Sequence, residues 1–174
     1  DDEQEKEWVY DSFSSLGEKA LPALTRYMRE SDTLAWPLKI LERITKGDRL
    51  LEGLAQLCEW NDNVYVRDPS KKIQLVHFLG EHKLPAIAQM IVPYLEDVDE
   101  GVRFKAVDAL LFQGLELSSE AVRKELLAAY VKLLTNPAEE SRRIKVRIVE
   151  CLRELGWELG EHRVRVEQAK AALG

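Results

Sequence analysis

Basic side chains recur at two fixed distances before glycine residues from residue 67 onward. Lys71, Lys105 and Arg147 each stand nine residues before a glycine, and Arg67 and Arg143 each stand thirteen before one. Positions four apart lie on the same face of a helix. In a stack of similar helices these five groups would therefore align into a basic stripe. Such a stripe would bind an acidic peptide or a nucleic-acid backbone through ion pairs.

The same residues also allow a purely structural interpretation. Lys105 stands three residues before Asp108, and Arg147 stands three residues before Glu150, so each cation could pair along its own helix. An exposed pair of this kind contributes only about 0.2 to 0.5 kcal/mol to stability. At the level of the sequence, both a binding stripe and a solvated helix face remain open.

Two tryptophans are further candidates for contact with a partner. Trp36 and Trp60 stand near the ends of expected helices, close to loops. Tryptophan is enriched where proteins meet partners, and it also fills large gaps in cores. We therefore treat Trp36 and Trp60 as candidate partner-binding residues beside the five basic ones.

Signatures of catalysis and of metal binding are missing from the sequence. None of the three histidines stands in an HExxH pattern, and the two cysteines, Cys58 and Cys151, cannot form a cysteine-rich zinc site alone. A GxSxG motif and a phosphate-binding glycine loop are also missing. The sequence therefore predicts no enzyme activity, no metal site and no cofactor.

Glycines divide the chain into units of one helix pair each. Five glycines follow segments with helical apolar spacing, and we interpret each as the residue that ends a helix. They are Gly17, Gly47, Gly80, Gly114 and Gly156. Between them, apolar periodicity predicts the partner helices, with one more helix at the end of the chain. These segments are 18–29, 48–59, 84–96, 119–134 and 161–173.

Polar residues and prolines mark the expected helix starts. Asp97, with Glu100 three residues later, indicates a capping pair ahead of Val102. The dipeptides Asp68-Pro69 and Asn136-Pro137 are typical of an N-cap followed by proline at the first helical position. Together with only nine glycines and six prolines in the chain, these signals favour an all-α fold.

One of these units carries a family resemblance. The segment 91–114, IVPYLEDVDEGVRFKAVDALLFQG, has a proline in its first helix, an aspartate in the turn, Val-Arg five residues later, and alanine and leucine along the second helix. The matching residues are Pro93, Asp97, Val102, Arg103, Ala106, Ala109 and Leu110. In this pattern the segment resembles the HEAT repeat. The segment 139–152 keeps the spacing with Glu139 and Lys145 in place of the aspartate and arginine, and 21–44 is a third copy. The unit around Ile73 is degenerate, because the loop 61–68 replaces the first turn of its second helix.

The resemblance implies a right-handed α-solenoid of stacked antiparallel helix pairs, as one repeat domain over residues 1–174. Neighbouring pairs in such a stack share a continuous core. In the HEAT family the turn acid and the arginine are associated with ladders between repeats. This implies structural contacts for Asp97, Arg103, Glu139 and Lys145. Because the chain starts with aspartate and not methionine, we also expect a fragment or a processed form of a longer chain.

Composition narrows the environment and the partner. The formal net charge of −6 disfavours a nucleic-acid partner without excluding one. No apolar run approaches the roughly 18 residues that a membrane span needs. The two widely separated cysteines do not suggest a disulfide framework and are typical of a reducing compartment. We therefore expect a soluble, cytoplasmic protein.

The predicted function is that of a non-enzymatic scaffold or adaptor. Its partner would be another protein or a peptide, bound on the concave face that the second helix of each pair forms. If the basic stripe binds the partner, the partner would be acidic. The alternative is a nucleic-acid-binding HEAT-like protein that uses the same stripe. The run RRIKVR at 142–147 favours this alternative, while the glutamates that follow oppose it. Some HEAT-like families act as lyases or glycosylases, but no matching constellation is found in this sequence.

Overall fold

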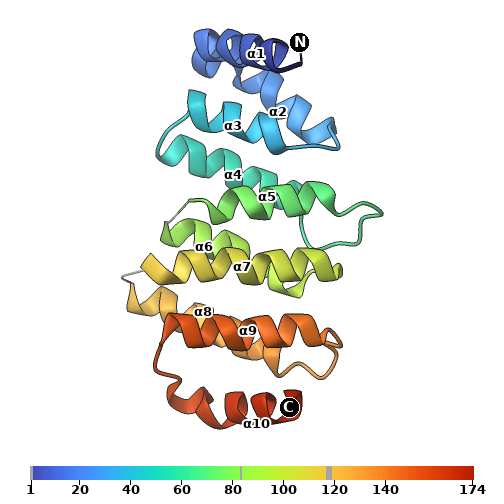
Figure 1. Ribbon diagram of the computed structural model, residues 1–174. Helices are drawn as coiled ribbons and strands as arrows, with labels where there is room; N and C mark the ends of the chain where they lie inside the picture. Colours follow the sequence, from blue (N-terminus) through green and yellow to red (C-terminus); the bar gives the residue numbers. More distant parts are fainter. Residues whose placement is uncertain (1, 83, 117–118) are drawn as a thin grey trace. The chain divides into compact units, whose positions relative to one another are not determined.

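The computed structural model describes residues 2–82, 84–116 and 119–174. Every regular element within these ranges is a helix, which confirms the all-α fold class (Figure 1). Contacts divide the chain into two compact units, Asp1–Asn61 and Asp62–Gly174. The single repeat domain over residues 1–174 and the right-handed solenoid stay predictions.

The first unit is built from four α-helices and a short 3-10 turn within its described residues. They are α1 (Asp2–Leu16), η1 (Gly17–Ala20), α2 (Leu21–Glu30), α3 (Ala35–Ile44) and α4 (Asp48–Trp60). Helix α3 packs on α1, α2 and α4. Because Leu24 and Met28 of α2 stand one helical turn apart, they face the core together with Leu38 and Leu41 of α3.

The second unit has two layers of helices. Its elements are α5 (Ser70–Gly80), α6 (Pro85–Ile91), η2 (Val92–Glu96), α7 (Glu100–Glu116), α8 (Glu120–Leu134), α9 (Arg142–Leu155), η3 (Gly160–His162) and α10 (Arg163–Leu173). In the first layer α7 lies between α5 and α9 and contacts both (Figure 1). In the second layer α6 and η2 contact α8, and α10 contacts both α8 and α9.

Apolar residues from both layers form the core of the second unit. On α7 the fully buried Val102, Ala106 and Leu110 follow one another at four-residue steps, so this face of the helix packs into the core. Tyr130 of α8 is also fully buried, and its hydroxyl donates a hydrogen bond of 2.8 Å to the Val107 carbonyl. This bond satisfies the one polar group of a side chain that otherwise contributes apolar area to the core.

The prediction that a glycine ends each helix holds at three positions and is wrong at two. Gly17 and Gly156 directly follow the last residues of α1 and α9, with φ of 55° and 61°, a left-handed conformation that glycine adopts readily. Gly80 is itself the last residue of α5. Gly47 instead precedes the first residue of α4, since α3 already ends at Ile44, and Gly114 lies inside α7.

The two helical glycines allow neighbouring helices to approach closely. A Cβ atom placed on Gly80 would stand 2.9 Å from the Cβ of Ala109. One placed on Gly114 would stand 2.7 Å from the side chain of Leu155. Both distances are too short for real carbon atoms, so close packing favours glycine at both positions.

Two helix starts also differ from the prediction. Asp97 is not the cap of α7, because Asp99 accepts the hydrogen bond from the Val102 N–H, at 3.0 Å. Asn136 is not the cap of α9, because Ser141 accepts the bond from the N–H three residues after it. The Asp97 side chain is therefore available for another contact, and Asn136 lies in the loop before α9.

Candidate partner-binding site

The seven candidate residues divide between the two units. Trp36 lies on α3 and Trp60 on α4, whereas Arg67 lies in the loop before α5, Lys71 on α5, Lys105 on α7, and Arg143 and Arg147 on α9. The two tryptophans thus belong to the first unit and the five basic residues to the second.

Both tryptophans are half-buried against residues of their own unit. The Trp36 ring lies 5.4 Å from the Tyr27 ring, centroid to centroid. The Arg29 guanidinium lies 5.4 Å from the Trp60 ring, within range of a cation–π interaction. Trp60 also lines a cavity of about 340 Å³ between α2 and α4. Contact of either tryptophan with a partner stays a prediction.

Helix α7 presents one row of side chains on the outer side of the α5–α7–α9 layer. The row consists of Phe104, Lys105, Asp108 and Phe112, at the three- and four-residue spacing of a single helix face. The Phe112 side chain is 55% exposed. We call this row, with the neighbouring side chains of α5 and α9, the α7 face.

Arg147 ties α9 to α7 and is occupied by carboxylates. Its Nε donates to Asp108 Oδ1 at 2.6 Å, and its Nη1 donates to Glu150 Oε2 at 3.1 Å. A third carboxylate, that of Glu154, lies 3.6 Å from the same Nη1. The hydrogen bond to Asp108 is the largest of the effects that raise the pKa of Arg147. Arg147 therefore acts as a structural link between two helices.

The expected pairs along single helices form only in part. Arg147 pairs with Glu150 as expected, but Asp108 bonds to Arg147 on the next long helix and not to Lys105. Within the described ranges Lys105 has no ion pair, although its side chain is half-buried at the α7 face. Lys105 thus stays available to a negatively charged ligand.

Arg143 combines exposure with a fixed position. Its guanidinium carbon lies 4.0 Å from the centroid of the Phe104 ring, which is a cation–π contact. Its Nε is 3.7 Å from a Glu100 oxygen that also accepts a hydrogen bond from Ser141. An exposed pair at such a distance is weak. Arg143 is therefore held over an aromatic ring while most of its guanidinium faces solvent.

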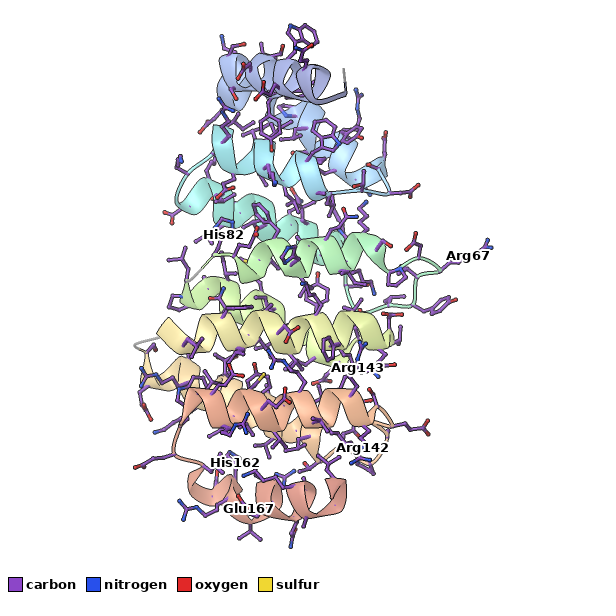
Figure 2. All side chains as sticks on the ribbon, in the orientation of Figure 1. Arg67, His82, Arg142, Arg143, His162 and Glu167 are labelled. Atoms are coloured by element: carbon purple, nitrogen blue, oxygen red, sulfur yellow. The ribbon has the colours of Figure 1, made fainter. Side chains whose placement is uncertain are left out.

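Arg67 and Lys71 lie at the start of α5. Arg67 is exposed in the loop that leads into the helix (Figure 2). Lys71 is half-buried on the first turn. The five cations of the basic stripe thus differ in their surroundings. Arg147 forms ion pairs with carboxylates, whereas Arg67 lies on a loop outside the helices.

Two buried ion pairs link each long helix to the turn before the next one. Lys72 of α5 bonds to Asp97 at 2.7 Å, and Arg103 of α7 bonds to both oxygens of Glu139 at 2.7 and 3.2 Å. Arg103 also donates to the Asp97 carbonyl at 2.9 Å. These are contacts of the kind that the HEAT resemblance implies for Asp97, Arg103 and Glu139.

Lys72 is not among the residues predicted from the sequence, because only the adjacent Lys71 fits the glycine spacing. Lys72 lies on the buried face of α5, because it stands one helical turn before the buried Val76. Helical periodicity could therefore have indicated that Lys72 points inward and needs a partner.

Two grooves flank α7 on the α7 face. The α5–α7 groove has a volume of about 420 Å³ and is lined by His77, Gly80, Glu81, Lys105, Asp108, Ala109 and Phe112. The α7–α9 groove has a volume of about 410 Å³ and is lined by Phe104, Arg142, Arg143, Val146, Arg147 and Glu150. Each groove therefore has a phenylalanine of α7 in its wall and basic side chains beside it.

A larger hollow of about 670 Å³ lies beside η2 and α8, in the second layer. Its charged residues already have partners: Arg103 bonds to Glu139, Lys132 to Glu96, Lys72 to Asp97 and Gln89 to Glu125. This hollow therefore offers a ligand fewer uncompensated groups than the α7 face.

Comparisons of the chain with known protein families, with curated proteins and with solved structures find no match. Among the described residues, no group of three or more His, Cys, Asp or Glu side chains is arranged to hold a metal ion. Within the same ranges, no helix is both long enough and apolar enough to cross a membrane.

Proposed function

We propose that this chain is a HEAT-like helical-repeat module that binds another protein on the α7 face and performs no chemistry itself. The observation that carries the proposal is the exposure of Phe112 beside a groove whose floor is made by the small residues Gly80 and Ala109. A large aromatic side chain left in solvent is costly, and exposed apolar patches mark interaction sites.

The distribution of charge supports this choice of face. In and beside the second layer, charged side chains of the protein pair with one another. Arg103, for example, donates hydrogen bonds to both carboxylate oxygens of Glu139. On the α7 face Lys105 has no ion pair in the described part of the chain, and Arg143 has only a weak one. Cations with a weak ion pair or none, beside an apolar groove, favour a ligand that brings both carboxylates and apolar side chains.

The nucleic-acid alternative is less well supported. Phosphate contacts need cations that keep their charge uncompensated, and Arg147 is surrounded by three carboxylates. The stripe that would follow a phosphate backbone is interrupted at that point. The net charge of −6 adds a general repulsion. We therefore favour a protein partner.

The proposal includes a cytoplasmic location. Cys58 and Cys151 are both reduced thiols, and Cys151 is fully buried. Burial raises the pKa of the Cys151 thiol to about 11, which keeps it protonated and unreactive at neutral pH. Cysteines that form no disulfide are ordinary in a reducing compartment.

Site-specific photocrosslinking tests the proposed face. A photoreactive phenylalanine analogue replaces Val146, which is exposed on the α7 face, and in a second variant it replaces Lys124, which is exposed on α8 in the other layer. Both variants are irradiated in the cells that make the protein. We expect an adduct with another protein from position 146 and not from position 124. Adducts from position 124 alone, adducts with nucleic acid, or no adduct from position 146 would each contradict the proposal.

A further inference from the structure

We infer that the α7 face recognises an acidic peptide segment of another protein that inserts two apolar side chains, one in the α5–α7 groove and one in the α7–α9 groove. The inference rests on the proposed function and adds to it the chemistry of the ligand. It depends on four features of the face: the floor of the first groove, the two phenylalanines, the uncompensated cations and the spacing of the grooves.

The α5–α7 groove is shaped to accept a side chain. Gly80 and Ala109 meet at its floor, where a Cβ on Gly80 would come within 2.9 Å of the Ala109 Cβ. Because neither residue extends above the helix backbones, the groove stays open between Phe112 on one side and His77 on the other. A leucine-sized or phenylalanine-sized side chain placed there would cover Phe112 and remove apolar area from water.

The α7–α9 groove repeats this arrangement one helix further along. Phe104 and Val146 supply the apolar surface, and the Val146 side chain is exposed. The Arg143 guanidinium covers part of the Phe104 ring at 4.0 Å. An apolar side chain in this groove would pack against Val146 and against the stem of Arg143, whose methylene groups are themselves apolar.

The cations at the two grooves select an acidic ligand. Asp108, the carboxylate nearest to Lys105 along α7, is already bound by Arg147 at 2.6 Å. Lys105 therefore faces the α5–α7 groove without a counterion from the described residues, and Arg143 has only Glu100 at 3.7 Å. A ligand carboxylate could pair with Lys105, and another could accept two parallel hydrogen bonds from Arg143.

The spacing of the two phenylalanines sets a minimum length for the ligand. Phe104 and Phe112 are eight residues apart on α7, which corresponds to about 12 Å along the helix axis. The grooves lie on opposite sides of α7, so the two apolar side chains of the ligand are at least that far apart. A segment with a single apolar side chain would fill one groove only.

A displayed library of random peptides, selected on the full chain, tests this inference. We expect the enriched peptides to carry Asp or Glu together with two large apolar residues. Their affinity should fall by about tenfold or more in Lys105→Glu and in Phe112→Ser, which remove the cation and the aromatic wall of one groove. Lys124→Glu on α8 and Val164→Ser on α10 are matched controls, because both side chains are exposed outside the face, and they should change affinity less than about twofold.

Circular dichroism and the thermal midpoint of each variant show whether it is folded. Val146→Asp provides a further probe, in the α7–α9 groove.

Enrichment of basic peptides, no enrichment, or equal binding by Lys105→Glu, Phe112→Ser and wild type would overturn the inference. If photocrosslinks from position 146 persist in that case, the face still binds a protein and only the ligand chemistry is wrong. Self-association of the chain that is lost in Phe112→Ser would show that a second copy is the occupant, and would also overturn it.

Discussion

The Lys72 ammonium and the Asp97 carboxylate form an ion pair of 2.7 Å in which the side chains are only 3% and 0% exposed. The same ammonium donates to the Val64 carbonyl at 2.6 Å, and the other carboxylate oxygen accepts from the Asp99 N–H at 2.9 Å. One buried pair thus joins helix α5, the loop before it and the turn before α7. Each polar atom of the pair has a partner, which is the condition under which buried charges are tolerated.

Breaking this pair should be costly. In Asp97→Ala the Lys72 ammonium stays buried without its counterion, so we expect the free energy of unfolding to fall by about 3 to 5 kcal/mol. Urea denaturation followed by circular dichroism measures the change. Glu52→Ala removes an exposed pair with Arg49 and should cost less than about 1 kcal/mol. Similar losses in the two variants would mean that Lys72 reaches water when Asp97 is removed.

The Arg103–Glu139 pair should make stability depend on acid pH. Burial raises the pKa of Glu139, but hydrogen bonds from Arg103 and from the Ser141 N–H outweigh it and leave the pKa below its ordinary value of 4.5. A group with a lowered native pKa stabilises the fold above its unfolded pKa, and this contribution is lost as the pH falls through the native pKa.

We therefore expect the thermal midpoint of the wild type to fall between about pH 5 and about pH 3 more steeply than that of Glu139→Gln. The variant should be less stable at neutral pH, and the two curves should approach each other in acid. Glu120→Gln, an exposed control on α8, should follow the wild-type curve. Parallel curves for Glu139→Gln and wild type would mean that Glu139 does not carry this dependence.

Gly80→Ala tests the close approach of α5 and α7. The new methyl group would meet Ala109 at 2.9 Å, so we expect a loss of about 1 to 3 kcal/mol from overpacking. Gly53→Ala on α4 is the control, because its new methyl group would meet only the flexible end of Leu41, at 3.3 Å. Alanine is the better helix former by about 1 kcal/mol, so Gly53→Ala should be neutral or stabilising. A Gly80→Ala variant as stable as Gly53→Ala would contradict the packing of these two helices.

Leu110→Ala tests the core of the second unit. Leu110 is fully buried on α7, and its truncation should cost about 2 to 5 kcal/mol. Lys124→Ala, on the exposed side of α8, should be nearly silent. Chemical denaturation of both variants measures the difference, and equal stabilities would show that the orientation of α7 is wrong.

Helix positions follow from the sequence because their signals are local. Apolar periodicity predicts α8 and α10 to within two residues of their observed bounds, since every residue that it uses lies on the helix itself. The role of a glycine is less local. Gly80 and Gly156 look alike in the sequence, yet one fits against Ala109 of another helix and the other takes a left-handed φ.

The candidate site could be predicted only in part, for the same reason. The glycine spacing correctly places Lys105, Arg143 and Arg147 on the long helices α7 and α9. It cannot show that Arg147 bonds to Asp108, because that contact spans 39 residues and depends on how α9 is shifted along α7. Nor can it show that Phe104 and Phe112 flank grooves, since each groove needs residues of a second helix.

Charge reversal on the α7 face tests the central claim most directly. The double variant Lys105→Glu with Arg143→Glu reverses one cation with no ion pair among the described residues and one with only a weak, exposed pair. Arg147 is left unchanged, because a glutamate there would face three carboxylates and unfold the α7–α9 contact. Lys124→Glu with Lys132→Glu on α8 changes the net charge equally and serves as the control.

The measurement is the dissociation constant for the protein captured from position 146, determined at low and at high salt. We predict binding at least about tenfold weaker for the α7-face variant, a change of less than about twofold for the control, and wild-type binding that weakens as salt screens the charges. Wild-type affinity in the α7-face variant, together with a loss in the control, would contradict the account and assign the partner to the α8 side.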